Sequence, residues 1–264
     1  MPQSLRERRI LRAQELAAEH EAAAEILDFF LHVMRFQEEL QLFIQKTKDT
    51  GRQTFADPIA PELAARFPQF LTTIEKHGPA ALAHEAQQLR RLSATDCCEL
   101  LNTFWMRPET TNALPGQQEF FARAFLQPYA EIVRVQSGKQ RQEWTPRLCP
   151  FCLRKPASGV LRPMGDGGQR CLVCSFCLGE WEFRRIVCAG CGEENETRLP
   201  VYTAQEFEHV RVECCDSCRS YIKTVDLTRN GLADPVVDEI ASVPLDLWAQ
   251  QKGYAKVQTN LMLL

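Results

Sequence analysis

Ten of the twelve cysteines in this 264-residue chain lie between Cys149 and Cys218. Eight of them form four Cys-x-x-Cys pairs. Two cysteines that are three residues apart can lie on one tight turn and direct both sulfurs at a common point. The pairs are Cys149/Cys152, Cys174/Cys177, Cys188/Cys191 and Cys215/Cys218. Two such turns that face each other supply the four thiolates that a tetrahedral Zn²⁺ or a single Fe ion takes. The sequence therefore predicts two four-cysteine metal sites.

The spacing between pairs is compatible with a metal-binding ribbon. Cys152 and Cys174 are separated by 21 residues, and Cys191 and Cys215 by 23. Zinc-type sites have roughly 15–20 residues between pairs, so both gaps are slightly long. Each gap has room for a short hairpin that brings the second turn back against the first. Cys171 with Cys174 forms an alternative pair whose gap of 18 residues also fits, and spacing alone leaves this alternative open.

Composition and charge narrow the classes of function. Hydrophobic residues make up 45% and charged residues 25%, as in ordinary soluble proteins, and the formal net charge is −3. Eight ionised thiols around two divalent ions would bring it to about −7. This balance disfavours nucleic acid as a partner.

The N-terminal stretch MPQSLRERRILRAQ has no apolar signal core. No run of ~18 apolar residues occurs, so we expect neither a membrane span nor a membrane partner. We therefore expect a cytoplasmic protein. In that reducing compartment a dense set of cysteines binds metal or acts in catalysis more often than it forms disulfides.

The secondary structure that must position the cysteines changes from helical to β-rich along the chain. Residues 1–143 read as a bundle of about five to seven helices. Within it, Ser93 and Asp96 form a capping box, and Pro128 should kink or divide the last helix. The polar stretch Gln136–Pro146 is the predicted linker.

Beyond the linker, short β-like segments alternate with glycine, and the chain ends in one further helix or two short ones. We predict two small metal-centred subdomains in tandem, at 144–186 and 187–230, followed by a helical segment at 231–264. Each subdomain has too few apolar residues to fold alone, so metal binding should drive its folding. The predicted fold class is α+β, with the helical bundle first.

Residues 145–264 contain a series of short motifs whose order along the chain resembles that of a known family. Besides the cysteine pairs they include Glu180-Trp181, Glu213-x-Cys215-Asp216-x-Cys218-x-x-Tyr221-x-Lys223, Asp234-Pro235, Ile240-Ala241-Ser242, Leu245-Asp246 and Gly253-Tyr254-Ala255. They resemble the formate dehydrogenase accessory protein family, FdhE. Leu153 and Arg219 stand where that family has a glycine after a pair, and Gly192 keeps it.

The resemblance implies rubredoxin-like or zinc-ribbon-like subdomains, each with four cysteines that hold iron, and with zinc as the alternative metal. It implies a cytoplasmic protein that binds the catalytic subunit of formate dehydrogenase before export and supports its maturation, with redox chemistry at the iron as a further implied role. It also favours Cys174/Cys177 over Cys171/Cys174 as the second half of the first site. The implied role is that of an accessory protein and not of an enzyme.

The other cysteines are predicted to be packing residues. Cys171 should pack on a strand, and Cys214 should face away from the metal because adjacent residues of a strand point to opposite sides. Cys97 and Cys98 sit at a helix start, a place that can lower a thiol pKa, but we interpret them as small buried hydrophobic residues.

The remaining candidates also have ordinary interpretations. His209 is expected to be a partly buried histidine and not a ligand, and Trp181 with Phe183 should pack near a sulfur cluster. Three cationic residues close to the cysteines in sequence are expected to be surface charges. The alternative is that they neutralise the charge of the metal sites or contact a partner protein. They are Lys155, Arg184 and Arg185.

Two other functions compete with the accessory protein. A zinc-ribbon module that binds nucleic acid or protein shares the cysteine spacing, but it predicts a basic stripe when the ligand is nucleic acid. A thiol–disulfide oxidoreductase needs one Cys-x-x-Cys pair with a low thiol pKa and predicts that the other pairs are dispensable.

Overall fold

The computed structural model describes residues 5–46, 53–106, 114, 117–137, 146–165 and 167–263. The chain divides into two compact units, one made of the residues up to 28 and most of 142–264, the other mainly of 29–141. The predicted linker falls largely on 138–145, outside the described residues. The domain boundaries set out above stay a prediction.

Helices dominate the described chain up to residue 137. They are α1 (Leu5–Glu19), α2 (Glu21–Lys46), α3 (Pro61–Ala64), α4 (Phe67–His77), α5 (Ala80–Leu89), α6 (Ala94–Met106) and α7 (Gln118–Ser137). The capping box before α6 is present, because Ser93 Oγ accepts a hydrogen bond from the Asp96 amide at 3.1 Å and Asp96 Oδ2 accepts one from the Ser93 amide at 3.2 Å. Within the described residues, no helix has both the length and the apolar character needed to span a membrane.

Phenylalanine rings form the core of the second unit. Phe67 and Phe70 of α4 are fully buried, as are Phe121 and Phe125 of α7. The rings of Phe67 and Phe125 meet edge to face with centroids 5.1 Å apart, and those of Phe70 and Phe121 do so at 6.4 Å. Such edge contacts add to the free energy gained by burying the rings.

Of the two outcomes expected at Pro128, a kink or a division, the division does not occur, because α7 is continuous through it. Proline has no amide hydrogen, so the carbonyl four residues earlier, that of Ala124, loses its helical donor. The buried side chain of Gln37 on α2 replaces that donor, with Nε2 donating to the Ala124 carbonyl at 2.7 Å. A polar side chain from a neighbouring helix thus completes the hydrogen bonding of α7.

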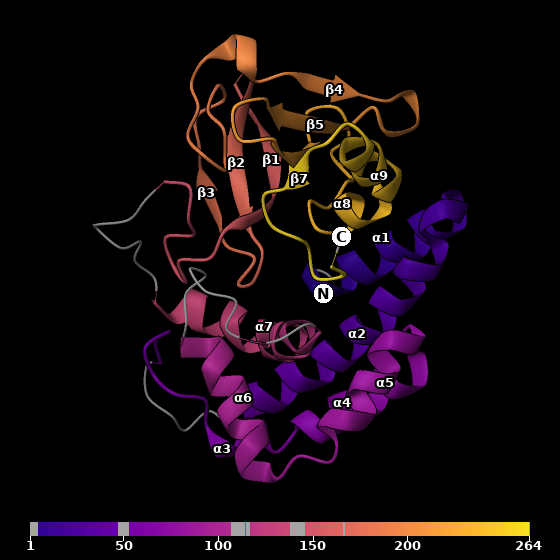
Figure 1. Ribbon diagram of the computed structural model, residues 1–264, viewed down its shortest axis with the longest axis vertical. Coiled ribbons are helices and arrows are strands. Elements are labelled where there is room, and N and C mark those ends of the chain that lie inside the picture. The colour runs from indigo at the N-terminus through magenta and orange to yellow at the C-terminus, as the bar shows by residue number, and fades with distance from the viewer. Residues whose placement is uncertain are drawn as a thin grey trace. The chain divides into compact units, whose positions relative to one another are not determined.

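The cysteine-rich half forms one sheet with short helices. The strands are β1 (Pro156–Met164), β2 (Gly167–Cys174), β3 (Glu180–Glu182), β4 (Val201–Thr203), β5 (Val210–Cys215), β6 (Ser220–Asp226) and β7 (Ala255–Lys256). The helices are α8 (Val237–Ala241) and α9 (Val243–Gln251), with 3₁₀ turns at Glu196–Arg198 and Gln205–Phe207. The order of the main path is β3-β2-β1-β6-β5-β4, and β7 pairs with β6. Figure 1 shows β3, β2 and β1 side by side at one end of this sheet.

The sheet contains the same motif twice. In each copy a cysteine turn precedes two antiparallel strands, a second cysteine turn follows, and a third antiparallel strand completes the ribbon. The first copy uses β1, β2 and β3, and the second uses β4, β5 and β6. The predicted α+β class, with helices first and two Cys-rich ribbons after them, is confirmed. The two ribbons share one sheet, which the tandem arrangement did not anticipate.

The ribbons join where β1 runs parallel to β6, with Ser158–Leu161 opposite Lys223–Asp226. Gly159 lies opposite Thr224 at this seam, and a Cβ atom on Gly159 would come 2.3 Å from Thr224 Oγ1. Any larger residue would force Thr224 to move, so glycine allows the close packing of the two strands here. The seam makes one sheet from two ribbons that are local in sequence.

One face of this sheet packs against α9. Alternate residues Val210, Val212 and Cys214 of β5 face the core, together with Leu245 and Ala249 of α9. The period of two is that of a strand with one buried face. The opposite face also carries buried residues, among them Leu161 and Ile222.

Buried charges fasten α8, α9 and β7 to β6. Lys223 Nζ is fully buried and lies 2.5 Å from Asp246 Oδ2 and 3.2 Å from Glu239 Oε1. Lys256 Nζ contacts the same two carboxylates, and Tyr221 donates to Asp246 Oδ1 at 2.7 Å. Although burial alone would raise it, Lys223 and Lys256 hold the pKa of Asp246 below its usual value. Two cations and two carboxylates therefore balance one another inside the unit.

The N-terminal helix α1 packs with the C-terminal segment. Arg12 of α1 pairs with the buried Asp238 of α8 at 2.6 Å, and Arg9 pairs with Asp234 at 3.3 Å. Asp238 also accepts from His209 at 2.7 Å. Although burial alone would raise it, the hydrogen bonds from His209 and Arg12 keep the pKa of Asp238 below its usual value.

We expect Gln37→Met to destabilise the second unit by about 1–3 kcal/mol, because the Ala124 carbonyl would be left buried without its donor. Adding Pro128→Ala should restore much of that loss, since residue 128 would regain an amide hydrogen for the same carbonyl. Urea unfolding of the two single variants and the double variant measures this coupling. Simple additivity of the two changes would contradict the role of Gln37.

Candidate metal centres

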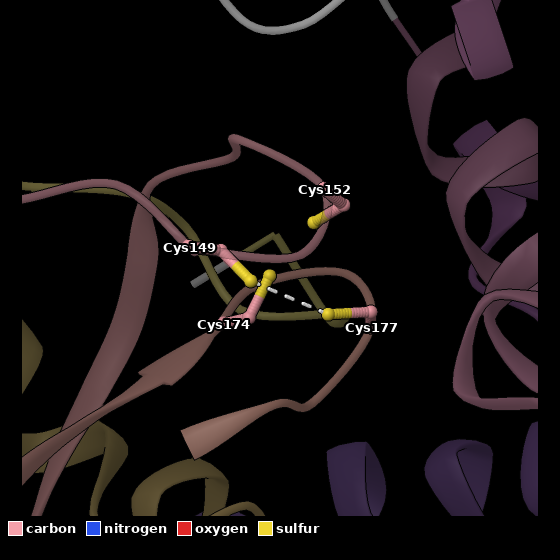
Figure 2. Close-up of side chains that lie close together, drawn as sticks. All are labelled: Cys149, Cys152, Cys174 and Cys177. Atoms are coloured by element: carbon pink, nitrogen blue, oxygen red, sulfur yellow. Dashed lines mark hydrogen bonds between the residues drawn. The ribbon is translucent and has the colours of Figure 1, made fainter. Parts of the chain in front are cut away.

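The first group of four sulfurs comes from the turns before β1 and after β2. Figure 2 shows Cys149 and Cys152 on one turn and Cys174 and Cys177 on the other, with the sulfurs directed toward a common space. Every pair of these sulfurs lies within 4.8 Å, and Cys149 Sγ is 3.5 Å from Cys177 Sγ. All four residues are buried, with exposed fractions from 0% to 9%.

The second group occupies the corresponding place in the other ribbon. It combines Cys188 and Cys191 with Cys215 and Cys218, again with every pair of sulfurs within 4.8 Å. Cys188 Sγ lies 3.7 Å from Cys218 Sγ, and Cys191 Sγ lies 3.7 Å from Cys215 Sγ. Sulfurs at ~2.3 Å around one tetrahedral ion would lie roughly 3.8 Å apart. Both groups are thus compact enough for a single ion each.

The backbone of each cysteine turn is closed by a similar pairing. In three turns the amide of the first cysteine donates to the carbonyl five residues later, from Cys149 to Arg154, Cys174 to Gly179 and Cys188 to Glu193, at 2.8–2.9 Å. In the fourth turn Cys215 is paired with Ser220, also five residues later, in the β5–β6 ladder. Because the same pairing closes each turn, both sulfurs of a pair point to the same side of that turn.

The residue after each second cysteine adopts a left-handed conformation. The φ angles are 62° at Leu153, 51° at Leu178, 85° at Gly192 and 55° at Arg219. Only Gly192 reaches this region without a steric cost. The turn geometry therefore survives at the positions where the sequence has leucine or arginine in place of the family's glycine, and the backbone there is strained.

Amide hydrogens point at the sulfurs of the first cysteine in two turns. The Phe176 amide donates to Cys174 Sγ at 3.4 Å, and the Gly190 and Cys191 amides donate to Cys188 Sγ at 3.3 and 3.4 Å. Such donors stabilise the thiolate form that binds a metal.

The two groups differ in exposure. The first is buried throughout, whereas Cys191 and Cys218 of the second are exposed. Although burial would raise it, hydrogen bonding to Ser220 and Cys191 lowers the pKa of Cys218 to about 7. Burial raises the pKa of Cys215 to about 12. The second group is thus the one that solvent, a chelator or another protein can reach.

Of the four cysteines outside the two groups, three are buried as expected and one is not. Cys171 lies in a cluster with Val160 and Val173, and Cys214 lies in the core beneath α9. Burial raises the pKa of both thiols, to about 12 for Cys214. Cys97 is buried in α6, and its neighbour Cys98 is only half-buried.

The other predicted candidates lie in ordinary surroundings. Trp181 is buried and donates to the Pro146 carbonyl at 2.8 Å. His209 pairs with Asp238, as a partly buried histidine should. Arg184 forms an exposed ion pair with Glu194 at 2.6 Å.

Several contacts around the second group escaped the sequence analysis. Ser220 Oγ lies 2.9 Å from Cys218 Sγ, and its position two residues after the cysteine could have identified it. Arg147 donates to the Gly190 carbonyl at 2.5 Å, inside the third turn. Tyr254 donates to Asp216 at 2.6 Å. Tyr254 and Asp216 are 38 residues apart, so only folding reveals that contact.

We expect Gly192→Ala to weaken metal binding at the second group by about 1 kcal/mol, because alanine is strained at a φ of 85°. A Cβ atom there would have its nearest contact at 3.7 Å, so the cost is conformational and not steric. Competition with a zinc chelator measures the change. Gly231→Ala is the control, with its nearest contact at 3.9 Å and no positive φ. Equal effects of the two variants would refute the assignment of strain.

The difference in exposure predicts the order of metal loss. On limited chelation of the metal-loaded protein, iodoacetamide should label Cys191 and Cys218 before any cysteine of the first group. Cys214 should stay unlabelled in the folded protein, because at neutral pH a thiol with a pKa of about 12 has almost no thiolate. Peptide mass spectrometry follows each site. Earlier labelling of Cys149 or Cys152 would contradict the prediction.

Comparisons with known proteins all point to the same family. Residues 148–185 match the FdhE central domain, and residues 186–263 match the FdhE C-terminal domain. A protein FdhE homolog of Aquifex aeolicus is 32% identical over 197 residues, which cover 74% of this chain and 68% of the relative. One from Shewanella oneidensis is 30% identical over 165 residues, covering 60% of this chain and 53% of the relative.

A solved structure has the same architecture. The crystal structure of the FdhE protein from Pseudomonas aeruginosa aligns with a TM-score of 0.68 and 25% sequence identity. The alignment covers 99% of this chain and 97% of that one, so it includes the helical half, which the two matched domains do not reach. With its two four-cysteine groups inside the matched domains, the chain belongs to the FdhE family.

Proposed function

We propose that this protein is an accessory protein for formate dehydrogenase that binds two metal ions. The observation that carries the proposal is the convergence of eight cysteines into two groups of four, inside the two domains that match FdhE. In this proposal all eight are metal ligands: Cys149, Cys152, Cys174 and Cys177 for the first ion, and Cys188, Cys191, Cys215 and Cys218 for the second.

The family resemblance favours iron in each site, with zinc as the alternative. Four thiolates suit either ion, and the sulfur spacing of 3.5–3.7 Å suits one ion per group. Bound iron would supply one-electron chemistry, and with four protein ligands it would have no open position for a substrate. The chain's own residues hold the thiolates in place, supply amide hydrogens to the sulfurs and exclude water from the first group.

The accessory role is to bind the catalytic subunit of formate dehydrogenase and support its maturation, without catalysis by this chain. We place this role in the cytoplasm, where reduced thiols remain available to metals. The family relationship supports the subunit as a partner, and the exposed sulfurs of the second group support that group as the one nearest to a bound partner.

The competing functions fit the molecule less well. A net charge of −3, with four thiolates at each site, disfavours nucleic acid. An oxidoreductase would use one pair alone, whereas each pair here faces a second pair within 4.8 Å.

Affinity capture tests the proposal. We expect the tagged protein, purified without oxygen from iron-replete cells, to carry two metal ions per chain and to retain the catalytic subunit of formate dehydrogenase. Cys152→Ser or Cys191→Ser should reduce the metal content to about one ion per chain, because three thiolates hold a metal far less tightly than four. Both variants should also weaken capture of the subunit.

Cys171→Ser is the matched control, since Cys171 lies in the same ribbon as Cys152 but outside the sulfur groups. It should keep both ions and the subunit. A protein that carries no metal, or that never retains the subunit, would overturn the corresponding half of the proposal. A colourless protein with two zinc ions would remove the electron-transfer role and leave the accessory role standing.

A further inference from the structure

A cavity of about 170 Å³ lies on the face of the sheet away from α9, beside the second sulfur group. Its walls come from β1, β2, β5 and β6 and from the segment between residues 185 and 201. A cavity needs only about 10–15 Å³ to hold one water molecule, so this one has room for a polyatomic ligand. Ile186 and Val201 on its wall are 49% and 53% exposed, so the cavity reaches the surface.

Three arginines and two glutamates line this cavity beside Cys188. Arg170 is 3% exposed and already neutralised, because it pairs with Glu213 at 2.5 Å and donates to the Arg184 carbonyl at 2.9 Å. It also lies over the Phe183 ring at 5.1 Å. Arg170 is therefore a fixed part of the wall.

The other two arginines are not matched in this way. Arg211 lies 3.9 Å from Asp226, too far for a hydrogen bond. Arg185 donates to the Gly168 carbonyl, which carries no charge. In the part of the chain that the structure describes, the buried Nε atoms of Arg170 and Arg211 have no hydrogen-bond partner. A buried cationic donor without an acceptor is costly, so a ligand that supplies acceptors would be stabilised here.

The wall also has apolar parts, including Leu161, Ile222, Ala189 and Leu199. These favour a ligand with little charge to desolvate. A carboxylate fits both requirements, since it has one negative charge and its two oxygens match the planar edge of a guanidinium. The thiolates of the second sulfur group would repel a dianion such as sulfate more strongly than a monoanion.

We propose that this cavity binds a carboxylate group, held by Arg211 and Arg185, next to the sulfur of Cys188. The carboxylate belongs either to a free small acid or to an acidic peptide segment. Since Cys188 lines the same cavity, the bound group would lie beside the second metal centre and would contact its surroundings without being a ligand of the ion. This site is additional to the accessory role and does not depend on it.

The test uses the metal-loaded full-length protein and acetate as the probe, at constant ionic strength. Saturation-transfer NMR titration gives the dissociation constant. We expect Arg211→Gln to weaken acetate binding at least tenfold and Arg185→Gln to weaken it severalfold. Arg162→Gln is the matched control, because Arg162 is an exposed arginine of the same sheet, paired with Glu180 at 2.6 Å, and does not line the cavity. It should change binding less than twofold.

Further measurements identify the source of the carboxylate and check that each variant is folded. Each variant should keep two metal ions per chain. Binding of formate, acetate and propionate supports a free acid. Binding of a short glutamate-containing peptide, but not of its glutamine counterpart, supports a peptide source. Absence of both kinds of binding would overturn the proposal, as would equal losses in Arg211→Gln and Arg162→Gln. Tighter binding of sulfate than of acetate would overturn the choice of a carboxylate.

Discussion

The convergence of four sulfurs at the end of each ribbon is the constraint on which the cysteine-rich half depends. Each group joins the turn before a hairpin to the turn after it, so it determines where the hairpin starts and how the third strand leaves. The outer strand of each ribbon is short, since β3 has three residues, as has β4. Ribbons of this size have little apolar surface of their own, so bound ions would supply much of their stability.

The left-handed residues show how strongly the sulfur geometry is imposed. Leucine and arginine normally avoid this region, at a cost of about 1–2 kcal/mol per residue. Three of the four turns nevertheless have a side chain there. That cost is consistent with a sulfur group that stabilises the turns by more than the strain destabilises them. The same backbone also directs amide hydrogens at Cys174 and Cys188.

The sequence predicted the local features well and the distant ones poorly. The cysteine pairs, the capping box at Ser93 and the packing of Cys214 all depend on neighbours in sequence or on the period of a strand. The continuous course of α7 through Pro128 depends on Gln37, which is 87 residues from the carbonyl that it satisfies and has no local pattern to identify it. The seam between β1 and β6 is also non-local, and a single glycine such as Gly159 does not reveal which strand it will meet.

The buried lysines of the C-terminal segment have the same non-local character. Lys223 and Lys256 satisfy Asp246 and Glu239 from two different strands, so each carboxylate depends on both. Buried ion pairs of this kind add little net stability compared with apolar packing, but they penalise any arrangement that separates the partners. We interpret this group as what determines the position of α8 and α9 on the sheet.

The parallel seam also has a thermodynamic consequence. Because β1 belongs to one ribbon and β6 to the other, loosening either ribbon disturbs hydrogen bonds that both share. An ion bound at one sulfur group would therefore raise the affinity of the other group, and linkage would make that effect mutual. Loss of one ion would in this way weaken binding of the other without abolishing it.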